Sequence, residues 1–339
     1  MLKALAYTGG RNVPSARFRI RQYIRLLAPL GIDLTESLAT FVAYPPRLRL
    51  VRPLWGVAHV ASRALDVVSD RDSDVVIFQR EMFSSTFTLE RFTRRPRILD
   101  VDDAIWLQRG GGFARRLAEL SDTVICGNSF IADWFSKWNA RIELLPTVVN
   151  TDRFTPSSAS NDRLVIGWSG TSGGFFYFKE VIEAVAEVLR EIPNAVFRVI
   201  SDVRPSLPSI PHNRMEYIPW SPEVEVTSLQ DIAVGLMPLD NSDWSRGKCS
   251  YKMLLYMSCG VPVVVSPVGM NSEVLQKGDM GFGATTHAEW VDAIMTLLRD
   301  EQLRRRMGQD GRRVVCERFS LSGAAPRMAQ IIMQVAVKA

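Results

Sequence analysis

A polar stretch near residue 250 holds the residue types that bind phosphate. Its three cations, Arg246, Lys248 and Lys252, lead into the apolar run MLLYMSCG, so the stretch opens a predicted helix. Backbone N–H groups without partners at a helix N-terminus attract anions, and nearby full positive charges strengthen that attraction. We interpret the stretch as a diphosphate cradle. The alternative is a solvated basic loop in front of a core helix.

Charged residues also follow two apolar runs in the first half of the chain. Arg80 and Glu81 follow one run, and Asp102 and Asp103 follow the next. Parallel α/β sheets bind ligands at the carboxyl ends of their strands. The two aspartates can accept hydrogen bonds from hydroxyl groups, take up a proton or pair with local arginines.

Two further features near the N-terminus suit a ligand. Gly9 and Gly10 end the first apolar run, where glycine lets the backbone approach a phosphate or a sugar, although an ordinary turn explains them too. Arg17, Arg21 and Arg25 recur at helical spacing. Such a row of cations suits an anionic partner and is also typical of a solvated helix face.

Short apolar runs alternate with amphipathic stretches, which predicts parallel sheets covered by helices. The predicted strands are Leu2–Tyr7, Ile32–Leu38, Val75–Phe78, Arg97–Val101, Thr123–Cys126, Arg141–Leu144, Leu164–Trp168, Val196–Ile200, Met215–Ile218, Ile232–Met237 and Val261–Val265. The predicted helices are Phe18–Leu30, Leu54–Ser69, Phe113–Leu120, Phe130–Trp138, Phe178–Glu191, Glu223–Gln230, Tyr251–Ser258, His287–Asp300 and Glu301–Arg318.

The Ser-rich segment Thr155–Arg163 divides these elements into two series and reads as a linker. We expect two Rossmann-like domains, residues 1–155 and 156–320, with a ligand-binding cleft between them. Residues 321–339 are expected to form a C-terminal helix that packs back on the first domain.

The composition of the 339 residues, 47% hydrophobic and 23% charged, is typical of globular domains and excludes a disordered chain. Before Pro156 there are 22 basic and 16 acidic side chains, and from Pro156 onward 19 and 20. All but two of the first 22 are arginines, which suit phosphate or carboxylate groups. The excess is modest and no platform of aromatic and basic residues appears, so no nucleic-acid partner is expected.

Cellular location follows from a few features. The four cysteines fit neither a metal pattern nor a disulfide framework, and no apolar span of 18 residues occurs, which indicates a cytoplasmic protein. The segment Leu48–Ala58 mixes arginines with apolar residues. It fits contact with an anionic membrane surface, and a core-facing helix with snorkelling arginines explains it equally well.

The block from Pro219 to Gly269 resembles the nucleotide-sugar-binding half of family-4 glycosyltransferases with the GT-B fold. The resemblance continues through Glu273, Gly281-Phe282, Trp290 and the segment Glu317–Ser320. It implies an α/β chain of two Rossmann-like domains with the nucleotide-sugar donor in the second. It also implies retention at the anomeric carbon, no metal and no cofactor other than the nucleoside-diphosphate sugar as co-substrate.

The resemblance also assigns roles. Arg246, Lys248 and Lys252 would stabilise the departing diphosphate. Asp102 and Asp103 are expected as further catalytic residues because of their place after a strand. The expected donor-binding residues are Gly170, Thr171, Ser172, Pro219, Trp220, Ser250, Tyr251, Gly269, Met270 and Asn271. Those expected to face the acceptor or the sugar are Gly9, Gly10, Arg17, Arg80 and Glu81.

One departure from the family's pattern concerns a pair of glutamates. Many members carry two glutamates eight positions apart, where this chain has Gly247 and Leu255. Leucine cannot accept a hydrogen bond from a ribose hydroxyl, so either the donor contacts are redistributed or the donor is held unusually.

The function we expect is sugar transfer from a nucleoside diphosphate to a glycan or a polyprenyl-diphosphate-linked acceptor. Such a transferase would serve cell-envelope polysaccharide or glycoconjugate synthesis at the inner face of the membrane, its arginine-rich first domain holding the acceptor. Two alternatives keep the fold. A nucleotide-sugar epimerase or hydrolase would convert the donor alone, and a non-catalytic binding subunit would not turn it over.

Overall fold

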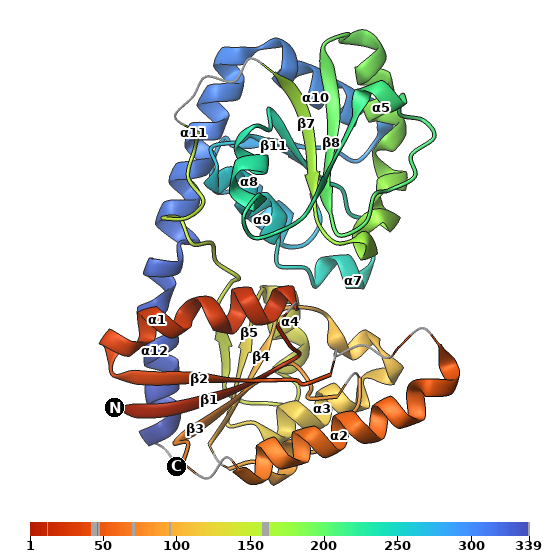
Figure 1. The fold of residues 1–339 in the computed structure, drawn as a ribbon. Coiled ribbons are helices and arrows are strands. Elements are labelled where there is room, and N and C mark those ends of the chain that lie inside the picture. Colours follow the sequence, from red (N-terminus) through yellow and green to blue (C-terminus); the bar gives the residue numbers. More distant parts are fainter. Residues whose placement is uncertain are drawn as a thin grey trace. The chain divides into compact units, whose positions relative to one another are not determined.

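The computed structural model describes residues 1–11, 13–41, 46, 48–69, 72–83, 85–94, 96–157 and 163–337. The chain divides into two compact units (Figure 1). Unit 1 comprises Met1–Val148, Gly247–Cys249 and Leu321–Ala339, and unit 2 comprises Val149–Arg246 and Ser250–Ser320. Each unit contains one six-stranded parallel sheet.

The sheet of unit 1 has the order β2-β1-β3-β4-β5-β6 with all strands parallel. The strands are β1 (Leu2–Thr8), β2 (Ile32–Leu38), β3 (Val75–Gln79), β4 (Arg97–Val101), β5 (Thr123–Cys126) and β6 (Ile142–Leu144). The central strands β3 and β4 are buried at every position, as expected for strands covered on both faces. All six predicted strands are confirmed to within one residue at either end.

Four helices of unit 1 are α2 (Arg52–Ser69), α3 (Gly112–Leu120), α4 (Ser129–Phe135) and α12 (Leu321–Val337). Helix α12 supplies Leu321, Met328 and Ile332 to the same buried cluster as Ala4 and Ile77 of the sheet. Residues 321–337 are therefore part of the core of unit 1. Helix α4 ends three residues before the predicted end at Trp138.

The single helix predicted over Phe18–Leu30 is wrong. In its place the chain forms a π-helix over Ala16–Ile20, 3-10 turns over Arg21–Tyr23 and Ala28–Leu30, and a four-residue α1 (Ile24–Leu27). The wider π turn accompanies the burial of Arg19, whose charged side chain points into the unit. Arg17, Arg21 and Arg25 therefore do not form a row along one regular α-helix.

The sheet of unit 2 has the order β12-β11-β10-β7-β8-β9, again with all strands parallel. The strands are β7 (Leu164–Ser169), β8 (Ala195–Ser201), β9 (Met215–Pro219), β10 (Val234–Met237), β11 (Val263–Val265) and β12 (Gly281–Gly283). The helices are α5 (Ile182–Glu191), α6 (Glu225–Gln230), α7 (Asp243–Arg246), α8 (Tyr251–Ser258), α9 (Met270–Leu275), α10 (His287–Arg299) and α11 (Glu301–Arg318).

Most predictions for unit 2 are confirmed, with three kinds of difference. β10 and β11 begin two residues later than predicted, and 3-10 turns over Ser172–Glu180 replace the start of the helix predicted from Phe178. β12, α7 and α9 have no predicted counterpart, because three to six residues are too few to show a period. Of the predicted linker, residues 158–162 lie outside the described residues.

Candidate functional site

Lys252 of α8 and the loop after β7 lie together in unit 2, although Lys252 and Gly170 are 82 positions apart in the sequence. A Cβ atom at Gly170 would lie 2.6 Å from Cε of Lys252 and 2.8 Å from the ring of Trp168. The Lys252 ammonium is 5.6 Å from the centroid of that ring. Only glycine fits at position 170 without displacing Lys252, so the lysine side chain crosses directly over the loop.

The rest of this loop, residues 170–172, is fixed by a carboxylate at the end of β8. The backbone N–H of Ser172 donates to Asp202 at 2.6 Å and its hydroxyl donates to the other carboxylate oxygen at 3.0 Å. Burial acts to raise the pKa of Asp202, but hydrogen bonds from Ser172 and Ser201 outweigh it and lower that pKa. The neighbouring Thr171 is exposed. Asp202 thus holds the loop in place, and the exposed Thr171 leaves the loop open to solvent.

Trp220 lies at the same edge of the unit 2 sheet, where β9 ends at Pro219. Its backbone N–H donates to the carbonyl of Ser201 at 2.9 Å, and its indole N–H donates to Glu225 at 3.2 Å. Glu225 is buried and also receives a hydrogen bond from Arg153 at 3.2 Å. These contacts orient the half-exposed indole beside the end of β8.

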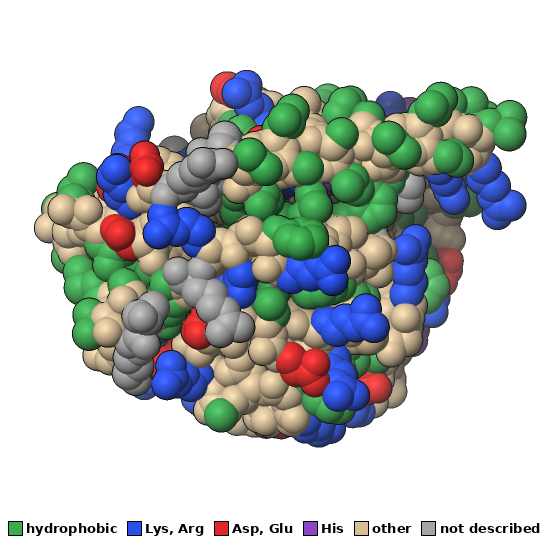
Figure 2. Space-filling view, turned by 90° about the horizontal axis from the view of Figure 1, so that it is seen from below, with side chains coloured by type: hydrophobic (Ala, Val, Ile, Leu, Met, Phe, Trp, Pro, Cys, Tyr) green, Lys and Arg blue, Asp and Glu red, His purple; other side chains and the backbone are tan. Residues whose placement is uncertain are grey.

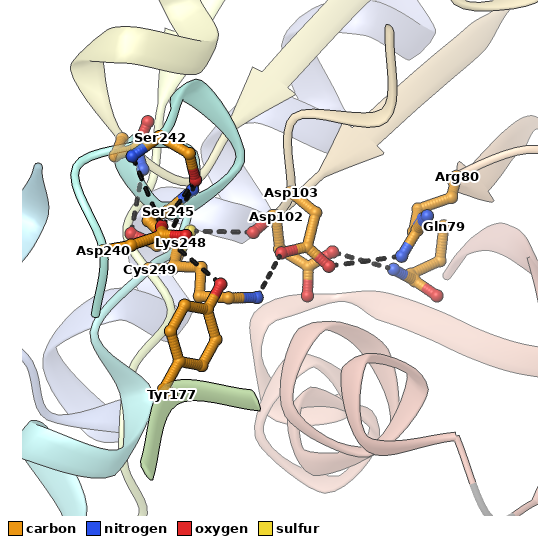
Figure 3. A network of polar contacts seen from close by, with 11 residues as sticks. Gln79, Arg80, Asp102, Asp103, Tyr177, Asp240, Ser242, Ser245, Lys248 and Cys249 are labelled. Carbon is orange, nitrogen blue, oxygen red and sulfur yellow. Dashed lines mark hydrogen bonds and ion pairs between the residues drawn. The ribbon is translucent and has the colours of Figure 1, made fainter. Parts of the chain in front are cut away.

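The polar segment before α8 is organised by Asp240 at the end of β10. Its carboxylate accepts hydrogen bonds from the hydroxyls of Ser242 at 2.6 Å and Ser245 at 2.5 Å. Tyr177 shares a hydrogen bond with Ser245 at 3.0 Å (Figure 3). The guanidinium of Arg246, in the next turn, donates to Asn241 at 3.1 and 3.2 Å. The segment is therefore held by its own hydrogen bonds, and the side chain of Arg246 is exposed on it.

Five of the expected donor-binding residues lie at the starts of α8 and α9. The Ser250 hydroxyl donates to Asn271 at 2.7 Å, and Asn271 donates to the carbonyl of Ser266 at 3.0 Å. Gly269 has a φ of 54°, and a Cβ there would lie 2.7 Å from the carbonyl oxygen of Arg246. Met270 is buried and Tyr251 is partly buried. The structure assigns Ser250, Gly269 and Asn271 a supporting role for the two helix starts.

In unit 1, charged side chains meet at the ends of β3 and β4 (Figure 3). Arg80, held at a φ of 66°, lies 3.3 Å from Asp103 and 3.8 Å from Glu81. Lys248 lies 3.7 Å from the other carboxylate oxygen of Asp103. With Asp102, these residues form what we call the Asp102 cluster: Gln79, Arg80, Asp102, Asp103 and Lys248.

Asp102 is the titrating member of the cluster. It is partly buried, and Gln79 donates a hydrogen bond to it at 3.4 Å. Burial raises the pKa of Asp102 to about 7, and the negative charge of Asp103 acts in the same direction, against the opposing charges of Arg80 and Arg19. A carboxyl group that titrates near neutral pH can take up and release a proton under physiological conditions.

This shift predicts a pH-dependent stability for unit 1. In the unfolded chain Asp102 titrates near its ordinary pKa of 3.8, so between pH 4 and pH 7 folding takes up a proton and stability falls as pH rises. Asp102→Asn removes this loss. We expect the variant to gain about 1–3 kcal/mol over the wild type between pH 4 and pH 8 in urea unfolding. Asp33→Asn, which removes an exposed carboxylate of β2, is the control, and an Asp102→Asn effect that does not change with pH would contradict the assignment.

The sequence groups Lys248 with Arg246 and Lys252, but Lys248 makes its contacts in unit 1 and the other two residues belong to unit 2. The segment Gly247–Cys249 belongs to unit 1, where the Asn128 amide donates to the carbonyl of Lys248 at 3.1 Å. The Cys249 thiol donates to the carbonyl of Asp102 at 3.2 Å. In the structure Lys248 thus lies beside Asp103, whereas Lys252 lies against the Gly170 loop.

The two positions where glutamates are common in the family have steric explanations. A Cβ atom at Gly247 would lie 2.6 Å from Cβ of Ala104 and 2.8 Å from its backbone nitrogen, so no larger residue fits. Leu255 is buried on α8. Gly247 thus has no room for a side chain, and the side chain of Leu255 is turned into the core.

The glycines and Arg17 after β1 lie at the carboxyl end of the unit 1 sheet. Gly10 adopts a φ of 129°, which favours glycine, and its carbonyl accepts a hydrogen bond from Arg21 at 3.5 Å. Gly9 is partly exposed beside it. The Arg17 guanidinium stacks 4.3 Å above the ring of Phe18. Arg21 is held by Glu36 at 2.8 and 2.9 Å, which neutralises its charge.

Sequence reasoning missed the residues that hold these groups. Asp202 directly follows β8 and Asp240 lies three residues after the end of β10, and a carboxylate just after a strand is a usable signal. The buried pair of Arg19 and Asp100 gave no such signal, because nothing in the sequence shows that Arg19 points inward. Its guanidinium donates to Asp100 at 2.5 and 3.0 Å and to the carbonyl of Leu145 at 2.8 Å.

Comparison with known protein sequences finds a family match that lies almost entirely in unit 2. The family model described as "Glycosyl transferases group 1" matches residues 172–300. N-acetyl-alpha-D-glucosaminyl L-malate synthase of Bacillus anthracis is 42% identical over 71 residues, which cover 20% of this chain and 18% of that relative. The matched segment is thus a small part of either protein.

Solved structures match over the full length. Sucrose-phosphate synthase of Thermosynechococcus elongatus has a TM-score of 0.75 at 14% identity, covering 100% of both chains. HepE of Anabaena in complex with UDP and glucose has a TM-score of 0.71 at 14% identity, covering 98% of this chain and 100% of that one. The chain therefore has the GT-B fold over its whole length, and its residues 172–300 match the model of group 1 glycosyl transferases.

Proposed function

We propose that unit 2 binds a nucleoside-diphosphate sugar and that the chain transfers the sugar to an acceptor. The observation that carries the proposal is Lys252 crossing the Gly170 loop at the carboxyl edge of a parallel sheet. An ammonium group over a solvent-open glycine loop suits a diphosphate, because backbone and cation can both approach its oxygens. A uridine diphosphate is the first candidate, since HepE of Anabaena was solved with UDP and with UDP-glucose.

In this proposal the cations act without a metal. Charge develops on the diphosphate as the bond to the sugar breaks, and Lys252 and Arg246 stabilise it. Thr171 and Ser172 meet the phosphates, and Trp220 lies beside the nucleobase. Transfer with retention at the anomeric carbon is part of the proposal and rests on the family resemblance.

The acceptor is proposed to dock on unit 1. Its arginine surplus suits an anionic acceptor, namely a glycan or a polyprenyl-diphosphate-linked sugar of cell-envelope synthesis. Asp102, with its pKa near 7, is the group suited to take the proton of the acceptor hydroxyl. Contact with a membrane surface through unit 1 would bring a lipid-linked acceptor within reach. No helix among the described residues is long and apolar enough to span a bilayer.

The proposal is tested by donor binding and turnover with the full-length protein. Calorimetry with UDP, GDP, ADP and TDP is expected to show one preferred diphosphate at a dissociation constant in the micromolar range. The matching sugar nucleotide is then incubated alone and with an extract of lipid-linked glycans. Release of diphosphate that depends on the extract supports transfer. Conversion of the donor alone indicates an epimerase or hydrolase, and no binding to any diphosphate indicates a binding subunit.

A further inference from the structure

The polarity of α2 is inverted with respect to an ordinary surface helix. Its inner face carries Trp55, His59 and Arg63, spaced one turn apart. His59 is buried and lies 3.1 Å from the carbonyl of Met82, and the buried Arg63 donates to the carbonyl of Ser37 at 3.1 Å. Helices on globular proteins turn apolar residues inward and polar ones outward. Here two polar side chains, His59 and Arg63, face the protein beside Trp55.

The opposite face of α2 is an exposed row of apolar side chains. Its large apolar side chains are mostly accessible: Leu54 75%, Val57 71%, Leu65 72% and Val68 61%, with Leu50 at 86% just before the helix begins at Arg52. Figure 2 shows these hydrophobic side chains along the helix at the top of the view. The structure therefore excludes the core-facing interpretation of Leu48–Ala58. We call this row the α2 stripe.

An uncovered row of this size marks a binding surface, since monomeric proteins rarely expose contiguous apolar patches. The helix has 18 residues and is about 27 Å long at 1.5 Å per residue, so the stripe is long and straight. Such geometry suits a flat apolar partner that can accept the whole length of the helix.

The charged residues around the stripe indicate which kind of partner it binds. Arg49 and Arg52 are exposed at the end where the helix begins. Between residues 48 and 68 the sequence has one acidic residue, Asp66, which is 32% exposed and lies 3.3 Å from the buried Arg63. Apolar side chains next to arginines, with a single carboxylate that is already paired, are the pattern of helices that lie in the interface of an anionic bilayer.

We propose that the α2 stripe docks unit 1 on an anionic lipid surface, with the helix lying parallel to the membrane plane. Leu50, Leu54, Val57 and Leu65 enter the boundary between headgroups and acyl chains, and Arg49 and Arg52 contact lipid phosphates. Docking deepens the proposed function, because it brings unit 1 to a lipid-linked acceptor. It needs no donor and no acceptor, so it is measured independently of sugar transfer.

The test is flotation of the full-length protein with vesicles of phosphatidylcholine alone or with 30% phosphatidylglycerol. We expect binding to the anionic vesicles and little to the neutral ones, weakening as salt is added. Leu54→Ser with Leu65→Ser should bind the anionic vesicles at least tenfold more weakly. Arg49→Gln and Arg52→Gln should each weaken binding about fivefold. The matched control is Leu144→Ser with Val337→Ser, two exposed apolar residues away from α2, which should bind as the wild type does.

The exposed positions are chosen so that the variants fold, which circular dichroism and the urea midpoint verify. Equal binding of the Leu54/Leu65 variant and the wild type would overturn the proposal, as would a wild type that ignores phosphatidylglycerol. The rival occupant is a second copy of the chain. A wild type that elutes as a dimer without lipid, and a Leu54/Leu65 variant that elutes as a monomer, would overturn lipid docking and assign the stripe to self-association.

Discussion

Replacing Lys252 with alanine is expected to lower turnover of the donor by about 10²–10³-fold, as loss of one group aimed at developing transition-state charge does in other enzymes. The ammonium lies over the Gly170 loop, where the departing diphosphate is proposed to sit. Because that charge appears as the sugar leaves, kcat should fall more than the donor's KM rises. Initial rates of diphosphate release at several donor concentrations measure both.

Two further variants separate charge from packing at this position. Lys252→Met keeps a flexible stem beside Trp168 and removes the charge, so it should be nearly as impaired as Lys252→Ala. Lys277→Met removes a lysine that lies exposed beyond the end of α9 and should keep normal rates. If Lys252→Met turned over donor at the wild-type rate, the lysine would have a packing role alone, and the assignment to the diphosphate would fail.

Replacing Arg19 with alanine is expected to lower the free energy of unfolding of unit 1 by about 3–5 kcal/mol, because Asp100 would keep a buried charge without its partner. Arg19 and Asp100 are at most 1% exposed and are joined by two hydrogen bonds. Burial alone would lower the pKa of Arg19, but the charge of Asp100 raises it above its ordinary value. Urea unfolding followed by tryptophan fluorescence should show an earlier transition for unit 1.

The control is Arg17→Ala, which removes a partly exposed arginine from the same π-helix and should change stability by less than about 1 kcal/mol. Arg19→Met combined with Asp100→Leu removes both charges and should recover most of the loss. Equal effects of Arg17→Ala and Arg19→Ala would show that the π-helix, and not the ion pair, determines stability here.

The sequence predicts the sheets well and the connections less well, for a physical reason. Strands such as Val75–Gln79 are buried on both faces, so they appear as unbroken apolar runs between polar segments. The segment from Ala16 to Leu30 contains similar letters at helical spacing. Its backbone is determined by one tertiary contact, the burial of Arg19 against Asp100, which no local period reveals.

The candidate site was likewise predictable from the sequence only in part. Gly170 and Lys252 were expected near one ligand from the family's pattern, and the structure places them in contact distance. The sequence groups Lys248 with Lys252 in one polar stretch before a predicted helix, yet the segment Gly247–Cys249 belongs to unit 1. Likewise the letters of α2 indicate an amphipathic helix, but only the structure shows which face is turned outward.

The order of the segments in unit 1 has a consequence for synthesis. The apolar face of β1 and β3 is covered by α12, which the ribosome makes only after the whole of unit 2. Unit 2 can therefore close as soon as its own last helix emerges, while the earlier strands of unit 1 wait with their core uncovered. The nascent chain is most exposed to aggregation and most in need of chaperones during that interval. Any stop codon before residue 321 would leave unit 1 permanently open.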